Sequence, residues 1–158
     1  MFKKIPIYSL LLGLTFYGCA GVSSAKMTEY RTTVGSTTLY DFQTLSEKIL
    51  NQHRFFVDRT EEIGSGYIVE TKYEYSRPTN EELIQGIKEI RYLIILEARR
   101  KGGGVGNAYT VRAIVRAYGR FTGNQEWVDI PINRDIKMRI KMFIADLKSE
   151  TENKIRAF

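Results

Sequence analysis

The chain has 158 residues and a formal net charge of +6, and 43% of its residues are hydrophobic and 27% charged. This length suits one domain with a single core, and the apolar content excludes an intrinsically disordered chain. With one cysteine and one histidine, the chain cannot form an internal disulfide or a cysteine–histidine zinc cluster.

The N-terminal residues have the pattern of an export signal. Two lysines precede an apolar run over residues 5–16, which is too short to span a bilayer, and Gly18 and Cys19 follow it. A cysteine that follows a small residue at this place is typical of bacterial lipoprotein signals, in which the thiol is acylated and the chain is cut before it. We therefore predict a signal peptide over residues 1–18 and a lipid anchor at Cys19.

Two alternatives to lipidation remain open. Phe16 and Tyr17 are bulkier than the residues that usually precede a lipidated cysteine. Residues 23–25 (Ser-Ser-Ala) form a small-x-small site, at which ordinary secretion would release a chain beginning at Lys26. The other alternative is a retained membrane anchor, which the shortness of the apolar run disfavours.

A tether and one folded domain are expected to follow the signal. Residues 19–36 are mostly small and polar, so we predict a flexible tether there and a single domain over residues 37–158. Apolar side chains recur at every third or fourth position over residues 38–52, which predicts a helix buried on one face. A short strand is expected over residues 54–58.

Four later segments have the pattern of strands. In the second half of residues 67–75 charged side chains alternate with uncharged ones, as in a strand with two different faces. This pattern predicts one shared face for Tyr67, Val69, Thr71, Tyr73 and Tyr75. Residues 89–100 are apolar at both parities, as expected of a central strand. Residues 107–120 are expected to form the strand next to it, and residues 126–130 are expected to extend the sheet up to Pro131.

The fold class follows from the order of these segments. Residues 81–86 are expected to form a loop or one short helical turn, and residues 133–154 predict the longest helix, with Asn133 as its cap. The connections between strands are too short for crossover helices, which predicts antiparallel pairing. We therefore expect an α+β two-layer sandwich, in which an antiparallel sheet of about four strands carries two helices on one face.

The outward side chains of the two longest predicted strands mix arginine with apolar residues. These side chains, which should lie on the face away from the helices, are Arg91, Leu93, Ile95, Arg112, Ile114, Arg116 and Tyr118. Apolar residues ringed by arginine are typical of a protein contact surface. The alternative is that flanking loops cover this face, or that its apolar residues are scattered singly.

The sequence has no pattern that indicates catalysis. No serine stands in a nucleophile-elbow context, and the adjacent glutamates at 61–62 and 81–82 belong to polar segments. We expect no catalytic residue, metal or cofactor. An exported chain without a recognition motif is also not expected to bind nucleic acid, whereas its positive charge is compatible with anionic lipid or glycan.

Four features carry a resemblance to a known family. Residues 49–57 lead from a helix into a strand, residues 66–73 (Gly-Tyr-Ile-Val-Glu-Thr-Lys-Tyr) follow a glycine turn, residues 91–95 start with arginine, and Trp127 precedes a long final helix. This order, over about residues 39–147, resembles the helix-grip domains of small outer-membrane lipoproteins. The C-component lipoprotein of the β-barrel assembly machinery carries such a domain. The resemblance implies a non-catalytic accessory lipoprotein facing the periplasm or the cell surface.

The expected function follows from the signal and the outward face together. We expect a lipid-anchored cell-envelope protein that binds a protein partner of an assembly or secretion complex. The alternative is an exported lipid- or glycan-binding module with a pocket between helices and sheet. Ala20 stands where an aspartate retains some lipoproteins in the inner membrane, which favours an outer-membrane lipoprotein facing the periplasm.

Overall fold

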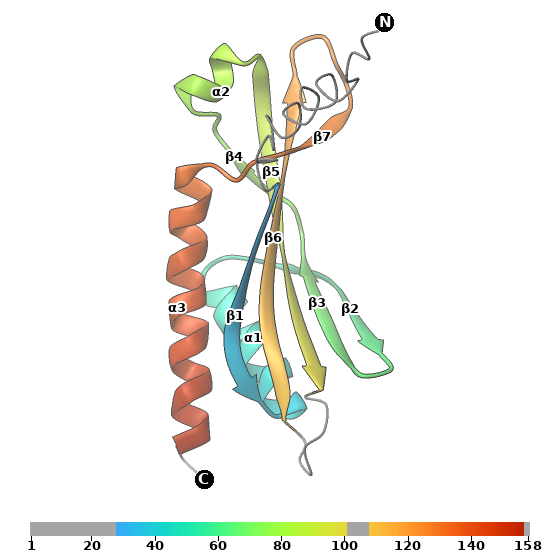
Figure 1. The fold of residues 1–158 in the computed structure, drawn as a ribbon, viewed down its shortest axis with the longest axis vertical. Helices are drawn as coiled ribbons and strands as arrows, with labels where there is room; N and C mark the ends of the chain where they lie inside the picture. The colour runs from blue at the N-terminus through green and yellow to red at the C-terminus, as the bar shows by residue number, and fades with distance from the viewer. Residues whose placement is uncertain (1–27, 101–107, 157–158) are drawn as a thin grey trace, which may run out of the picture.

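A computed structural model describes residues 28–100 and 108–156 of the chain. They form one long, twisted antiparallel sheet, with two helices packed along one face and a short helix at one end (Figure 1). In chain order the elements are β1 (Glu29–Thr37), α1 (Leu39–Gln52), β2 (Val57–Ile63), β3 (Gly66–Thr71), β4 (Glu74–Ser76), α2 (Asn80–Ile84), β5 (Ile87–Arg100), β6 (Tyr109–Phe121), β7 (Trp127–Ile130) and α3 (Arg134–Arg156).

The predicted fold class is wrong in its count of strands and helices. In place of about four strands and two helices, the described part of the chain has a seven-stranded antiparallel sheet and three helices. The main strand order is β1-β6-β5-β3-β2, while β4 pairs with β5 and β7 with β6. The two predicted helices are present as α1 and α3, since periodic apolar residues at this length indicate a buried helix.

Strand β1 lies where a flexible tether was expected. Residues 29–36 belong to this strand, which pairs antiparallel with β6 and places Glu29 opposite Arg116. Its threonines are polar but β-branched, and such side chains suit a strand. The composition of β1 therefore resembles that of a linker, and only pairing with a distant strand makes it part of the sheet. The rest of the expected tether, the signal peptide and Cys19 lie outside the described residues.

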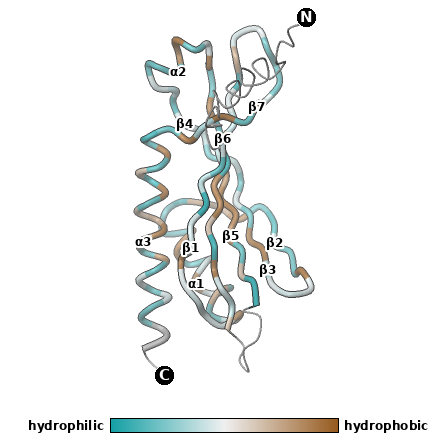
Figure 2. Tube along the Cα trace, in the orientation of Figure 1, coloured by the Kyte–Doolittle hydropathy of each residue, from teal (hydrophilic) through white to brown (hydrophobic). Residues whose placement is uncertain are grey.

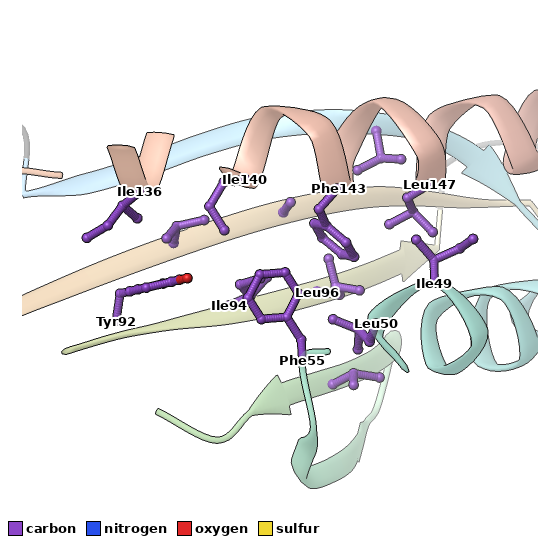
Figure 3. Close-up of a cluster of buried hydrophobic side chains, with 14 of the residues drawn as sticks. Ile49, Leu50, Phe55, Tyr92, Ile94, Leu96, Ile136, Ile140, Phe143 and Leu147 are labelled. Atoms are coloured by element: carbon purple, nitrogen blue, oxygen red, sulfur yellow. The ribbon is translucent and has the colours of Figure 1, made fainter. Parts of the chain in front are cut away.

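The hydrophobic core lies between the sheet and the pair formed by α1 and α3. Figure 3 shows side chains from both helices converging on the inner face of β5. Phe143 of α3 has its ring centre 5.6 Å from that of Phe55, which lies 6.4 Å from the ring of Tyr92. Asn133 accepts a hydrogen bond from the backbone N–H of Ile136 at 2.9 Å, which caps the start of α3 as predicted.

A bulge splits the predicted strand over residues 67–75 into β3 and β4. Residue 70 lies opposite Ile95 and residue 74 opposite Tyr92, so residues 71–73 face only two residues of β5. The extra residue reverses the alternation, because successive side chains point to opposite faces of a strand. Tyr73 and Tyr75 therefore leave the face that Tyr67, Val69 and Thr71 occupy. The prediction that all five share one face is wrong for these two tyrosines.

The Thr71 side chain closes the gap that this bulge leaves in the sheet. Its hydroxyl oxygen accepts a hydrogen bond from the backbone N–H of Ile94 at 3.0 Å, and both residues are buried. We expect Thr71→Val to lower the free energy of unfolding by about 1–3 kcal/mol, because it leaves that buried N–H without an acceptor. Urea denaturation measures this loss. Thr60→Val, at an exposed position of β2, makes the same chemical change and should stay within about 0.5 kcal/mol of wild type. Equal stabilities of the two variants would contradict the proposed role of Thr71.

Candidate functional site

The structure brings all seven predicted surface residues to one face of the β5–β6 hairpin. In this register Arg91 lies opposite Tyr118, Leu93 opposite Arg116, Ile95 opposite Ile114, and Arg112 opposite Glu97. The residues between them, such as Tyr92 and Val115, point into the core under α1 and α3. We call the side turned away from these helices the outer sheet face.

The aliphatic centre of the outer sheet face is not exposed. Leu93 is 5% exposed and Ile114 3%, whereas Arg112 and Arg116 are exposed and Ile95 is intermediate. Figure 2, which colours the chain by hydropathy, shows hydrophobic residues gathered in the middle of the long strands. Of the seven predicted residues, the exposed ones are therefore two arginines, and the aliphatic centre that the arginines were expected to ring is largely buried.

Arginine and aromatic side chains gather at the end of the outer sheet face where β4 and β7 pair with the long hairpin. We call this group the Arg91 cluster; its members are Tyr73, Tyr75, Arg91, Tyr118, Arg120 and Trp127. The guanidinium carbon of Arg91 lies 4.0 Å from the ring centre of Tyr73 and 4.2 Å from that of Trp127. At these distances the positive charge interacts favourably with the faces of both rings, by about 0.5–2 kcal/mol each.

Edge-to-face contacts between rings hold the cluster together. Tyr73 and Tyr118 have ring centres 5.9 Å apart, and Tyr75 and Trp127 have theirs 6.3 Å apart, with interplanar angles of 79° and 67°. This geometry brings the positive edge of one ring toward the negative face of the other. Tyr75 is nevertheless 66% exposed and Tyr73 41%, so the cluster presents ring surface to solvent.

Arg91 differs from Arg31, Arg116 and Arg120 of the outer sheet face in its charge partners. Arg31 and Arg116 both bind Glu29, at 2.7 and 3.0 Å, and Arg120 binds Glu89. Within the described residues the side chain of Arg91 has no ion pair or hydrogen bond, and its buried Nε has no partner. A buried donor left without a partner is uncommon in folded proteins. Aromatic rings alone therefore hold this guanidinium in place.

Tyr118 and Glu29 keep their usual charges near neutral pH. Burial raises the pKa of Tyr118, and the neighbouring Tyr73 and Asp129 also raise it, whereas Arg116 acts to lower it. Because the net shift is upward, the Tyr118 hydroxyl remains protonated near neutral pH. Burial also acts to raise the pKa of Glu29, but hydrogen bonds from Arg116 and Arg31 outweigh it and lower that pKa. Glu29 therefore stays ionised and holds β1 against β6.

The largest groove described lies apart from the outer sheet face. It has a volume of about 490 Å³ and is lined by α2 and by the segment that joins β7 to α3. The carboxylate of Glu82 accepts hydrogen bonds there from the backbone N–H of Thr79 at 2.7 Å and from the side-chain amide of Asn133 at 3.2 Å. Since these groups cap α2 and α3, this part of the polar lining of the groove is already used in joining the two helices.

Sequence reasoning missed four members of the Arg91 cluster. Tyr73 and Tyr75 were placed on the wrong face because the bulge is not visible in the sequence. Arg120 and Trp127 come together only through the pairing of β6 with β7, in which they lie opposite each other. The one signal that could have drawn attention to this end of the sheet is the position of Trp127, the single tryptophan of the chain, in a short terminal strand.

Over residues 28–100 and 108–156, no three histidine, cysteine or acidic side chains lie close enough to share a metal ion. Among the helices described, none combines the length and apolar character needed to cross a membrane. No protein-family model matches the chain, and no curated protein matches its sequence.

Proposed function

We propose that the protein is a lipid-anchored, non-catalytic accessory of the bacterial cell envelope that binds a partner protein through the Arg91 cluster. The observation that carries this proposal is the composition of the cluster. Tryptophan, tyrosine and arginine are the residues most enriched where alanine substitution weakens protein–protein binding most. Here one tryptophan, three tyrosines and two arginines gather on a sheet face that α1 and α3 leave uncovered.

The interior of the fold gives less support to the alternative of a lipid- or glycan-binding pocket. Such a pocket would have to lie between the helices and the sheet. Phe143, Tyr92 and Val111 occupy this space and are 0%, 1% and 2% exposed. A ligand there would have to displace close-packed side chains, at a cost of several kcal/mol for each aromatic ring removed from the core, on the order of 3–5.

The anchor and the outer-membrane location rest on the sequence around Cys19. Ten peptide units join Cys19 to Glu29, so they span at most about 35 Å. Glu29 lies opposite Arg116, two residues along β6 from Tyr118, a separation of about 7 Å. A lipid at Cys19 would therefore keep the Arg91 cluster close to the membrane, where partners anchored in the same membrane are concentrated.

Mass spectrometry of the protein purified from membranes tests the anchor. We expect a lipid-sized increase in mass on a chain that begins at Cys19, and no such increase in Cys19→Ala. A lipid-free chain that begins at Lys26 would overturn the anchor and the membrane location together.

Site-specific photo-crosslinking in the native envelope tests the protein-binding role. A benzophenone amino acid replaces Tyr75, which is 66% exposed in the cluster, and in a matched control it replaces Tyr40, which is 76% exposed on α1. We expect one reproducible protein adduct from position 75 that is absent from position 40 and is lost when Trp127→Ala is added. Identical adducts from both positions, or none from position 75, would contradict partner binding at the cluster.

A further inference from the structure

We infer that Arg91 is a receptor for a carboxylate, and that the partner offers an acidic peptide segment to the Arg91 cluster. This inference rests on the proposed function and adds the chemistry of the partner to it. Its basis is the contrast between Arg91 and its neighbours. Arg31, Arg116 and Arg120 lie on the same face and each has a glutamate partner, whereas Arg91 has none within the described residues. Within the same residues Arg112 has no ion pair either, but it is exposed, whereas the Nε of Arg91 is buried without a partner.

The two nearest rings hold the guanidinium in a fixed orientation. Tyr73 and Trp127 lie 4.0 and 4.2 Å from its central carbon, and the buried Nε has no hydrogen-bond partner in the described residues. Because Nε is buried, a carboxylate would have to meet the edge formed by the two terminal nitrogens, and that edge also matches the two oxygens of a carboxylate. Because the side chain is already ordered, binding would lose less conformational entropy than at a mobile surface arginine.

The surroundings of Arg91 favour a peptide over an anionic membrane surface. The exposed surface of the cluster is aromatic, and the second arginine, Arg120, already has Glu89 as its counter-ion. Asp129 lies beside Tyr118 in the strand pairing, so the local charge is mixed. A lipid surface requires several free cations in one patch. Within the described residues the Arg91 cluster offers one guanidinium without an ion pair, bordered by aromatic rings, which fits a single acidic side chain with apolar neighbours.

Fluorescence of Trp127 provides the direct test, because it is the only tryptophan of the chain and contacts Arg91. The full-length protein is titrated with a ten-residue peptide of alternating glutamate and valine, and with its glutamine-for-glutamate counterpart. We expect a saturable change with the acidic peptide and at least about tenfold weaker binding of the neutral one, as for the loss of a charged hydrogen bond. No saturable change with the acidic peptide would overturn the inference.

Three variants test whether binding of the acidic peptide depends on Arg91 itself or on the positive charge of this face in general. Arg91→Gln should weaken binding of the acidic peptide at least about tenfold, and Arg91→Lys at least about fivefold, since lysine cannot offer the planar edge. Arg112→Gln removes the same charge from an exposed arginine on the same face, for which no cation–π contact is found among the described residues, and should stay within twofold of wild type. Thermal unfolding confirms that each variant is folded; if Arg91→Gln is not, the lysine variant decides. Equal weakening by Arg91→Gln and Arg112→Gln, or full affinity in Arg91→Lys, would overturn the inference.

Two other probes distinguish this inference from its competitors and from the proposed function. Binding of oligogalacturonate or of phosphatidylglycerol vesicles, without binding of the acidic peptide, would replace the peptide by an acidic glycan or a lipid surface and overturn the inference. If the adduct at position 75 survives Arg91→Gln in the native envelope, the partner does not need this carboxylate contact and only the inference fails. If no adduct forms although the acidic peptide binds, the proposed function fails and the carboxylate site stands.

Discussion

Phe143→Ala should lower the free energy of unfolding by about 3–5 kcal/mol, the usual range for a phenylalanine removed from a core. The Phe143 side chain is fully buried, and its ring centre lies 5.6 Å from both the Phe55 ring and the His53 ring (Figure 3). It therefore joins α3 to the end of α1 and to the chain that leads into β2. Domains of this size are typically stable by about 5–15 kcal/mol, so the variant should lose a large share of the total.

Urea denaturation of Phe143→Ala beside Met142→Ala measures this effect. Met142 precedes Phe143 on α3 but is 60% exposed, so its truncation should change stability by no more than about 0.5 kcal/mol. Comparison of the two variants separates the loss of a buried side chain from any general effect of an alanine substitution on this helix. Similar stabilities of the two variants would show that α3 does not pack on the sheet through Phe143.

Gly66→Ala is expected to be the most damaging of the small substitutions, with a loss of about 3 kcal/mol or more. A methyl group at this position would overlap the backbone carbonyl oxygen of Ala98 on β5, which is part of the sheet and cannot rotate away as a side chain could. The two strands would have to separate where β3 begins. Gly66 is thus required by the close approach of two backbones.

Gly64→Ala is the matched control, because Gly64 lies in the same turn between β2 and β3. A methyl group there meets no atom within 4 Å, so the variant should stay within about 0.5 kcal/mol of wild type. Urea denaturation of both variants, with far-ultraviolet circular dichroism to report strand content, measures the difference. Equal stability of the two alanine variants would contradict the packing of β3 against β5.

The elements that could be predicted are those whose signal is local. The apolar stripe over residues 38–52 indicated α1, and the stripe that includes Phe143 indicated α3, because an interval of three or four residues places side chains on one side of a helix. The outer sheet face was predicted for a similar reason. The β5–β6 pairing has no register shift between Glu89 and Arg100, so simple alternation placed Arg91, Leu93 and Arg112 correctly on one face.

The elements that could not be predicted depend on a partner far away in the chain. The composition of β1 is that of a linker, and its strand character comes from pairing with β6, about 80 residues later. The bulge beside Thr71 exists because residues 71–73 must pass two residues of β5, which no pattern within residues 67–75 reveals. The burial of Leu93 and Ile114 on the outer sheet face likewise could not be inferred from alternation alone.

The sequence by itself determined the two long helices and the faces to which the residues of β5 and β6 point. These properties depend on neighbours within a few residues, and the periods of helices and strands make them visible. Only the tertiary structure decided the number of strands, the course of the chain through β1 and the assembly of the Arg91 cluster. Tyr73, Arg91 and Trp127 come from β4, β5 and β7 or their flanks, and they meet because a bulge and two strand pairings bring them together. Contacts of this kind depend on register between distant segments, and local sequence patterns do not specify that register.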